Sequence, residues 1–217
     1  MTPADLSHVP LFASLSPAEL DAVGRLAIIR SYPKNTIVAS EHDRGDSLFV
    51  ILSGMVRIYM SDENGREIEL GTEGPGEFFG VMIFDGGPRS ASTLTLEKSR
   101  VAVFSRADFE TLMERHPVIA MQLIRKLIHR LRVATENIKR LGLLDVYGRI
   151  VELLLTEFAE ERPKESSGRR VTQQEIAHRV GASREMVGRI LRDLGRGGYI
   201  SIKSGRITLL KKPPRAW

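Results

Sequence analysis

The sequence predicts an α+β protein in which an N-terminal β-roll, of the jelly-roll kind, is followed by a long dimerisation helix and a C-terminal winged helix-turn-helix. Three observations predict this order. Short runs of β-forming residues alternate with Gly, Asp and Asn over residues 33–104, a long helical pattern begins at Pro117, and residues 171–194 have the pattern of two short helices joined at a glycine. The predicted domains are residues 1–116, 117–141 and 142–217.

The first element is predicted to be helical over residues 4–31. Ser16 and Glu19 have the spacing of a capping box, and Pro17 stands at the first helical position after Ser16. Apolar residues recur on one face of this helix, and we expect them to point inward: Leu20, Val23, Leu26 and Ala27.

The β-roll is predicted from short strands at near-regular spacing, a pattern typical of small barrels and jelly rolls. We expect six strands, at residues 36–39, 47–52, 55–60, 67–71, 92–96 and 100–104. Turn signals separate several of them, at Ser53-Gly54, Asn64-Gly65 and Gly74-Pro75-Gly76.

A short helix is predicted at residues 108–115, and a long one from Pro117 to a break at Gly142. Apolar or small residues recur along the long helix at alternating steps of four and three, which is the spacing of a coiled-coil seam. This predicted dimer interface contains Ala120, Ile124, Leu127, Leu131, Ala134, Ile138 and Leu141. A second stripe is expected to pack on the roll: Ile119, Leu123 and Ile128.

The alternative for the long helix is burial in the core of a monomer. The seam is narrow and is flanked by Arg125, Arg132 and Lys139, which favours a homodimer. A two-fold protein also matches a two-fold DNA site. Beyond this helix, Asp145 is expected to cap another helix that runs to about residue 161, followed by a polar loop at 162–170.

Residues 171–194 have the pattern of a helix-turn-helix. Thr172 and Glu175 form a capping box at the start of the first helix, whose apolar stripe is Ile176, Ala177 and Val180. Gly181 provides the backbone freedom that a tight turn needs, and Ser183 is a good N-cap for the second helix.

The second helix is predicted to read DNA. Val187, Ile190, Leu191 and Leu194 are expected to point inward, which leaves another face formed by Arg184, Glu185, Gly188, Arg189 and Arg192. The first turn of a recognition helix contacts base edges, where Arg suits guanine and Glu can accept a hydrogen bond from cytosine. An ordinary helical hairpin with a solvated face is the alternative.

The surroundings of this hairpin favour DNA binding over that alternative. Two short strands, 199–203 and 206–210, flank a Ser204-Gly205 turn and predict the wing of a winged helix-turn-helix, in which Arg206 is expected to contact phosphate. Residues 169–217 carry twelve basic and three acidic side chains, a concentration typical of a nucleic-acid-binding domain. The tail at 211–217 is expected to be frayed.

Composition excludes several other classes. The chain has no cysteine, which rules out disulfides and cysteine-held iron–sulfur clusters. The five histidines show no paired metal-ligand spacing, so we expect no metal and no haem. No run of 18 apolar residues predicts a membrane span, and the first 20 residues do not form a secretory signal, so the expected compartment is the cytoplasm.

At this point the chain resembles the Crp/Fnr family of bacterial transcription regulators, and within it the cyclic-AMP receptor branch. The resemblance covers nearly the whole length and is carried by Gly54, residues 75–80, 88–92 and 144–150, and Ser183–Arg189. In the family an Arg-Glu-x-x-x-Arg pattern reads half-sites of TGTGA type, and Arg184, Glu185 and Arg189 match it. RNA polymerase is a further partner that the resemblance implies.

The resemblance also implies a cyclic-nucleotide site in the roll. An Arg-Ser pair at the end of a loop binds the phosphate in the family, and Arg89 and Ser90 match it. A guanidinium forks onto phosphate oxygens, a hydroxyl adds a donor, and glycines such as Gly80 let backbone N–H groups approach. Phe79 lies beside Gly80 in this predicted site. A structural ion pair of Arg89 with Asp85 or Glu77 is the alternative.

One position departs from the cyclic-AMP pattern. The family places a Glu after the glycine to hold the ribose 2′-OH, but Val81 follows Gly80 here, and the loop is about one residue short. Glu77 is the nearest acid. Either Glu77 substitutes, or the ligand is not held by a 2′-OH contact, or there is no nucleotide. On this basis we expect cyclic AMP to bind more weakly than in better-matched relatives, or not at all.

The long helix gives a second indication of altered ligand recognition. A Thr-Ser pair on this helix touches the adenine in the cyclic-AMP receptor branch, one residue from each subunit. Thr135 matches the second position, and Ala134 lacks the hydroxyl of the first.

The sequence therefore predicts a homodimeric, effector-controlled regulator that binds palindromic double-stranded DNA. The alternative is a regulator that needs no ligand or answers an effector other than cyclic AMP, with the roll as a structural platform. No nucleophile–base pair or metal constellation supports an enzyme.

Overall fold

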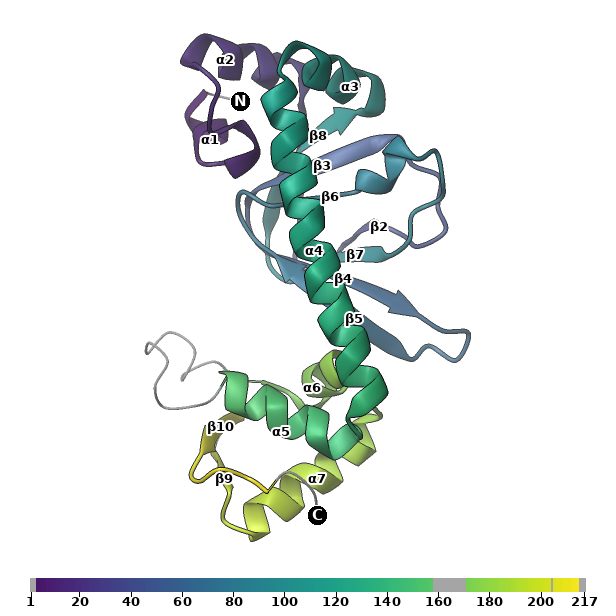
Figure 1. Cartoon of the computed structure of the whole chain (residues 1–217), viewed down its shortest axis with the longest axis vertical. Helices are drawn as coiled ribbons and strands as arrows, with labels where there is room; N and C mark the ends of the chain where they lie inside the picture. The colour runs from purple at the N-terminus through teal and green to yellow at the C-terminus, as the bar shows by residue number, and fades with distance from the viewer. Residues whose placement is uncertain (1–2, 158–170, 204, 215–217) are drawn as a thin grey trace. The chain divides into compact units, whose positions relative to one another are not determined.

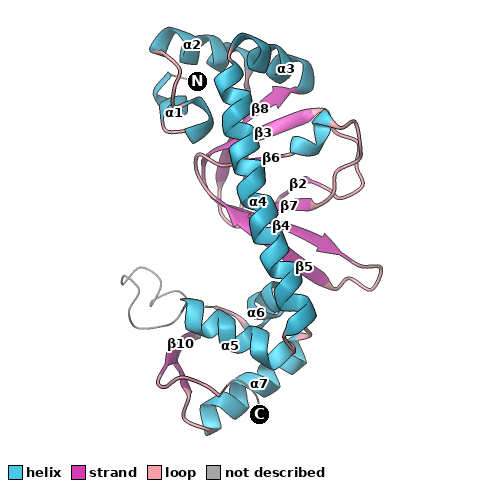
Figure 2. Ribbon diagram, in the orientation of Figure 1, coloured by secondary structure: helices cyan, strands magenta, loops and turns pink. Residues whose placement is uncertain are grey.

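The computed structural model describes residues 3–157, 171–203 and 205–214. The chain folds as two compact units. One contains residues 1–60 and 69–132, and the other contains residues 61–68 and 133–217. Figures 1 and 2 show the elements of both units, which are described in turn.

The N-terminal segment consists of short helices and then a strand. Helix α1 spans Pro3–Ser7, the 3-10 helix η1 spans Pro10–Phe12, and α2 spans Pro17–Leu26. The capping box of Ser16 and Glu19 is present as predicted. The predicted helix over 4–31 was too long, since residues Ile28–Tyr32 form strand β1, whose partners in β8 lie 67 to 75 positions later in the sequence. Leu26, the last residue of α2, is 37% exposed rather than inward-facing.

The β-roll contains two four-stranded sheets, with strand orders β1-β8-β3-β6 and β2-β7-β4-β5. All six predicted strands are present within three residues of their expected ends, and two others, β1 and β6, were missed. Those after β1 are β2 (Ile37–Ala39), β3 (Ser47–Ser53), β4 (Val56–Ser61), β5 (Glu67–Glu73), β6 (Phe78–Phe79), β7 (Ser92–Thr95) and β8 (Ser99–Ser105).

Two apolar cores lie on opposite faces of the β3-containing sheet, as the period-two alternation of side chains requires. Phe49 of β3 and Phe79 of β6 point to one face, where their rings stack at 4.7 Å in a core shared with Val56 of β4. Val50 and Phe78 point to the other face and pack against the N-terminal helices and the helices that follow β8.

Helix α3 spans Arg106–Arg115, and the long helix α4 spans Pro117–Leu143. Figure 1 shows α4 running along the face of β3, β6 and β8. Ile119 and Leu123 are buried there as predicted, but Ile128 is 47% exposed and Leu127 packs on the roll in its place. Residues 119, 123 and 127 are spaced four apart and therefore lie on one side of the helix. Residue 128, which the prediction placed there, lies off that side. Gly142 does not break α4, which ends one residue later.

The second unit contains a winged helix-turn-helix. Its helices are α5 (Val146–Glu157), α6 (Gln173–Val180) and α7 (Arg184–Arg196), and its wing is the antiparallel pair β9 (Ile200–Lys203) and β10 (Arg206–Leu209). Asp145 caps α5 by accepting a hydrogen bond from the Gly148 backbone N–H at 2.7 Å. The predicted continuation of α5 to residue 161 and the loop at 162–170 lie outside the described residues.

One core joins these helices to the wing, with Ile150 and Leu154 of α5, Ile176 of α6 and Leu194 of α7 fully buried. Of the tail expected to be frayed, residues 213 and 214 are in contact with this unit, which corrects the expectation for them, and residues 215–217 lie outside the described residues. Pro213 is buried, and the Tyr147 hydroxyl donates a hydrogen bond to the Pro214 carbonyl at 3.0 Å.

Candidate nucleic-acid interface and ligand site

The turn between α6 and α7 is built by the residues that the sequence indicated. The Thr172 and Ser183 hydroxyls accept hydrogen bonds from backbone N–H groups of Glu175 and Met186 at 3.1 and 3.2 Å, so each helix begins at a capped residue. Gly181 ends α6 in the left-handed region at φ 61°. These local contacts fix where α7 begins, and hence which side chains lie on its first turn.

Helix α7 separates charge from apolar surface. Val187, Leu191 and Leu194 are buried, and the exposed side chains include those of Arg184, Glu185, Arg189 and Arg192. The structure therefore presents the charges of Arg184, Glu185 and Arg189 to solvent on one helix, with its apolar face fixed in the core.

Gly188 does not share that exposed surface, contrary to the sequence-based expectation. It is buried, and a Cβ built on it would lie 2.9 Å from the Gln173 side-chain oxygen at the start of α6. A glycine at this point lets α6 and α7 approach closely. Its helical position, next to Val187, places it on the packed side rather than on the exposed one.

Arg206 of the wing and Thr172 at the start of α6 also lie at the surface of this unit. Arg206 is exposed and stands opposite Lys203 in the antiparallel pair, so two cations lie on neighbouring strands. Thr172 is exposed as well, although its hydroxyl is engaged in the α6 cap. The wing is anchored by Ile207, which is buried in the core of this unit.

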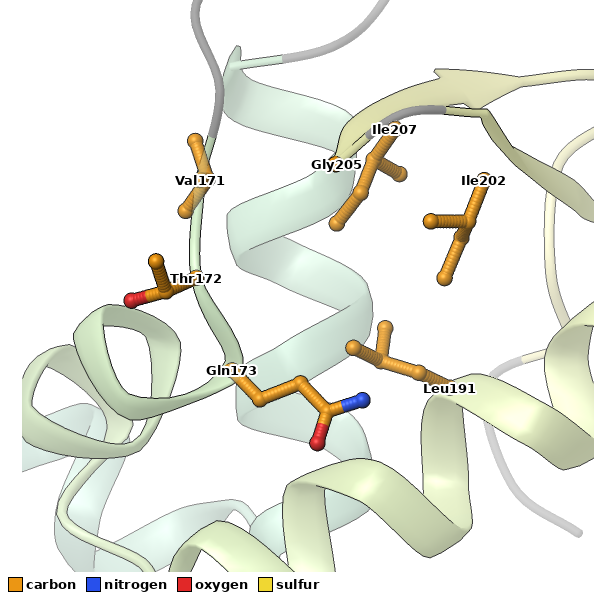
Figure 3. A pocket seen from close by; sticks show the side chains of 7 residues that line it. All are labelled: Val171, Thr172, Gln173, Leu191, Ile202, Gly205 and Ile207. Carbon is orange, nitrogen blue, oxygen red and sulfur yellow. The ribbon is translucent and has the colours of Figure 1, made fainter.

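A pocket of about 380 Å³ lies between the wing, α7 and the start of α6 (Figure 3). Its lining is mostly apolar, and the side chains drawn in Figure 3 come from Val171, Thr172, Gln173, Leu191, Ile202, Gly205 and Ile207. The Gln173 amide and the Thr172 hydroxyl are its polar side-chain groups.

In the roll, Arg89 lies beside the loop that precedes β3. Its backbone N–H donates to the Asp43 carbonyl at 2.9 Å, and its guanidinium lies 5.3 Å from the centre of the Phe49 ring. Burial lowers the pKa of Arg89, while the charges of Asp43 and Asp46 act in the opposite direction. Arg89 is therefore a half-buried cation whose acidic neighbours are Asp43 and Asp46.

The partners considered for Arg89 from sequence are engaged elsewhere. Glu77 forms an ion pair with Lys126 of α4, with 2.5 Å between Nζ and Oε1. Asp85 accepts a hydrogen bond from the Gly87 backbone N–H at 2.8 Å.

Gly80 brings the backbone close to this guanidinium. Its φ of 87° is in the left-handed region, and a Cβ built there would lie 3.1 Å from Arg89 Nη1 and 2.8 Å from the Ser47 carbonyl oxygen. The predicted role of Gly80, close approach of the backbone, thus has a geometric basis. Ser90 is exposed beside Arg89. Phe79 is buried and stacked on Phe49, so it forms the interior of the roll instead of an open contact surface.

Sequence reasoning missed three charged residues around the turn between β5 and β6: Glu73 at the end of β5, and Lys126 and Arg130 on α4. Arg130 Nη2 lies 2.9 Å from Glu73 Oε1. The four-residue spacing of Lys126 and Arg130 was the available signal, because it places both cations on one side of the helix.

The exposed apolar stripe of α4 follows a different register from the predicted seam. Large exposed residues recur at Met121, Ile124, Ile128, Leu131 and Ile138, and the exposed Thr135 completes the alternating steps of three and four. Ile124, Leu131 and Ile138 belong to both registers. Thr135 thus lies on the stripe, whereas Ala134 lies one residue round the helix.

Within the described ranges 3–157, 171–203 and 205–214, no group of three or more His, Asp or Glu side chains is arranged to hold a metal ion. Among the same residues, no helix combines the length and apolar character that crossing a membrane requires.

Comparison with protein families divides the chain in two. Residues 29–116 match the cyclic nucleotide-binding domain, and residues 148–213 match the Crp-like helix-turn-helix domain.

Comparison with individual proteins extends the match to nearly the whole chain. The chain is 34% identical over 215 residues to the CRP-like cAMP-activated global transcriptional regulator of Mycobacterium tuberculosis, covering 97% of this chain and 96% of that protein. It is 31% identical to the cyclic AMP receptor protein of Thermus thermophilus over 91% of each. The c-di-GMP responsive global regulator CLP of Xanthomonas campestris has a similar structure, with TM-score 0.79, 29% identity and coverage of 89% of this chain and 99% of that one.

Proposed function

This chain belongs to the Crp/Fnr family of transcription regulators, whose members are not enzymes, and on that premise we propose that it acts as a homodimer that binds palindromic DNA with TGTGA-like half-sites under the control of a cyclic nucleotide. Its place of action is then the cytoplasm, where it meets DNA and RNA polymerase. The observation that carries the proposal is the exposed charge of Arg184, Glu185 and Arg189 on α7.

The DNA contact is supported by the chemistry of these side chains. Arg184 and Arg189 offer planar donor pairs that fit guanine O6 and N7, and the Glu185 carboxylate accepts from a cytosine amino group. They lie in the first two turns of α7, the part of a recognition helix that enters the major groove. Arg206 of the wing is suited to a phosphate contact, which adds affinity on any sequence.

The homodimer is supported by the exposed stripe of α4. Ile128 and Ile138 are 47% and 70% exposed on a helix whose opposite side is already packed on the roll. A second copy of the same helix supplies a matching apolar surface, because identical stripes are complementary about a two-fold axis. Two recognition helices related by that axis then contact two half-sites one helical turn apart.

The cyclic-nucleotide site is supported by Arg89. Its guanidinium is half-buried, lies against glycine backbone at Gly45 and Gly80, and is suited to a phosphodiester with two free oxygens. Relatives are named as cAMP-activated and as c-di-GMP responsive, and both ligands carry such a phosphodiester. Calorimetric titration with each ligand distinguishes a cyclic mononucleotide from a cyclic dinucleotide.

The test of the DNA proposal is a binding-site selection at fixed salt with wild-type protein and alanine variants. Arg184→Ala and Arg189→Ala are each expected to weaken binding by about 1–3 kcal/mol and to relax the base preference at one position of each half-site. Arg206→Ala should weaken all sequences alike and reduce the salt dependence.

Arg196→Ala is the matched control for this selection, because Arg196 is an exposed arginine at the last position of the same helix. It should leave the base preference unchanged. Failure to enrich a palindrome, or an unchanged preference in Arg189→Ala, would refute the assignment of α7 as the recognition helix.

A further inference from the structure

Residues 144–150 join α4 to α5 and supply none of the proposed ligand or DNA contacts. Arg149 of this segment is half-buried on the first turn of α5, within the second unit. Its guanidinium donates one hydrogen bond from Nε to the Val180 carbonyl and another from Nη1 to the Leu144 carbonyl, each at 2.8 Å. One side chain therefore bridges two backbone positions that lie far apart in the sequence.

The two carbonyls of this bridge stand at the ends of two helices. Val180 is the last residue of α6, and Leu144 is the first residue after α4. Carbonyl groups at a helix C-terminus lack partners within the helix and carry partial negative charge, so a cation is favoured there. The planar guanidinium donates in fixed directions, which fixes one carbonyl relative to the other. Arg149 thus holds the end of α6 at a set position relative to the end of α4.

Two further contacts hold the last turn of α4 on the same fold. Leu141 reaches the turn between α6 and α7, where a Cβ built on Gly181 would lie 3.6 Å from Leu141 Cδ2. Arg140 Nε lies 3.4 Å from the Glu152 carboxylate of α5. Both contacts precede Gly142, where the sequence predicted a break, and the Arg149 bridge follows it. The last turn of α4 is consequently packed on the helix-turn-helix as well as joined to it by the chain.

The position of the recognition helix depends on this bridge. The turn that follows Val180 leads directly into α7, which begins at Arg184. In the proposed homodimer the two-fold axis runs beside the exposed stripe of α4, and Ile138 of that stripe belongs to the same unit as α7. The bridge therefore sets how far, and at what angle, each recognition helix stands from the two-fold axis.

We propose that Arg149 is a positioning residue that sets which spacing of half-sites the dimer accepts. It acts through the carbonyls of Leu144 and Val180 and needs no contact with DNA. The inference rests on the proposed binding of palindromic DNA by a homodimer. Changing the spacing by one base pair moves a half-site by about 3.4 Å and rotates it by about 35°. A fixed bridge opposes that adjustment, whereas a loosened one permits it and gives up preorganisation.

The experiment measures how strongly the full chain prefers one spacing. Fluorescence anisotropy at fixed salt gives the affinity for the enriched palindrome, for versions one base pair shorter or longer, and for a single half-site. Wild-type protein is expected to bind the enriched spacing at least about 10-fold more tightly than the altered ones. Arg149→Met keeps a long stem without donors, so this ratio should fall to about 3-fold or less, while the affinity for the single half-site stays within about two-fold of wild type.

Two other variants complete the comparison. Arg149→Lys keeps the positive charge but replaces the planar fork with an ammonium, so it should lose the ratio as well, even if Arg149→Met proves too unstable to titrate. Arg179→Lys is the matched control, because Arg179 joins α6 to α5 through a hydrogen bond from Nη1 to Glu157 at 2.6 Å and is not part of the bridge. It should keep the full ratio. Thermal melting checks that each variant is folded.

The outcomes separate positioning from general stability and from the proposed function. A ratio that survives in Arg149→Met or Arg149→Lys, with half-site and palindrome weakened alike, overturns the positioning role. A ratio that falls equally in Arg179→Lys overturns the assignment to Arg149. Equal binding of all spacings by wild-type protein overturns the inference and leaves the half-site sequence in place. A wild-type protein that enriches no palindrome overturns the proposed DNA function, and the role of Arg149 with it.

Discussion

Helix α7, the proposed recognition helix, exposes its arginines and buries its apolar residues, whereas the roll and the long helix α4 each hold a half-buried arginine and α4 also exposes an apolar stripe. Arg89 and Arg130 are half-buried beside carboxylates, while Ile128 and Ile138 face solvent. Exposed cations can bind a polyanion without giving up other partners. Half-buried cations must first give up their intramolecular carboxylate partners. An exposed apolar stripe indicates a surface that another protein surface covers. On the proposed function, the side chains that contact one DNA half-site are exposed in a single chain, whereas the roll and α4 gain partners from a ligand and a second copy.

The largest expected effect is on DNA affinity and comes from the exposed apolar stripe of α4. Ile128→Asp places a charge on it, and should yield monomers in light scattering and lower the affinity for a palindrome about 1000-fold, roughly 4 kcal/mol, toward non-specific binding. Ala134→Asp is the control, because Ala134 is exposed about 100° round the helix from Thr135. A dimer that persists in Ile128→Asp but dissociates in Ala134→Asp would restore the register predicted from sequence.

The next largest expected effect is on nucleotide affinity and concerns Arg89, the half-buried cation of the roll. Arg89→Ala should lower cyclic-nucleotide affinity by at least about 100-fold, roughly 2.7 kcal/mol, because the phosphate loses its bidentate donor. The melting temperature should change little, since the hydrogen bond that the guanidinium donates to the Ser47 carbonyl is long at 3.5 Å. Arg44→Ala removes an exposed arginine of the neighbouring loop and should leave nucleotide affinity intact. Equal affinities for Arg89→Ala and wild type in calorimetry would rule out the phosphate contact.

Two glycines with positive φ allow the backbones of the two regions to be compared. Gly80→Ala should destabilise the protein by about 2–3 kcal/mol, because its Cβ would meet the Ser47 carbonyl oxygen at 2.8 Å. Gly181→Ala should cost only about 1 kcal/mol, since no atom lies closer than 3.6 Å to the added Cβ and the left-handed conformation is the sole penalty. Thermal melting of both variants tests the order, and Gly181→Asn should be tolerated better than Gly181→Ala. Equal losses for the two alanine variants would contradict the close approach at Gly80.

A smaller expected effect tests whether the carboxylates near Arg89 compete with the nucleotide for its guanidinium. Asp43→Asn removes a negative charge near Arg89 and should strengthen nucleotide binding two- to five-fold, less than about 1 kcal/mol. The gain should shrink at high salt, as expected for an exposed charge. Asp21→Asn on α2 serves as the control for a general change in net charge. Equal gains in both variants would show that Asp43 acts only through the total charge.

The smallest effect concerns the recognition helix itself. Gly188→Ala should change stability by less than about 1 kcal/mol, because better helix propensity offsets the displacement of the flexible Gln173 side chain. Base preference in a site selection should be unaltered, since Gly188 is buried. A shifted preference at any base position would return Gly188 to the DNA interface.

Much of the winged helix-turn-helix could be predicted because its signals are local. The caps at Thr172 and Ser183 and the turn at Gly181 each involve residues within four positions of one another. The burial of Gly188 could not be predicted in this way, because it depends on Gln173 of the preceding helix, 15 residues away.

The candidate ligand site was harder to predict. Arg89, Ser90 and Gly80 were identified through resemblance, and the glycine has the left-handed backbone that its role requires. The acidic neighbours of Arg89 and the pairing of Glu77 with Lys126 remained hidden, because those charges come from separate loops and from α4, brought together only by folding.

The sequence by itself determined the elements that short-range contacts define: the capped helix starts, the turns at Gly54, Gly65 and Gly76, and six of the eight strands of the roll. Only the tertiary structure decided that residues 28–32 form a strand, that Phe79 lies inside the roll, that Leu127 packs where Ile128 was expected, and that Glu73 meets Arg130. A strand that pairs with β8 and an ion pair across 57 positions gain their free energy from partners distant in sequence. Local propensity carries no information about such partners.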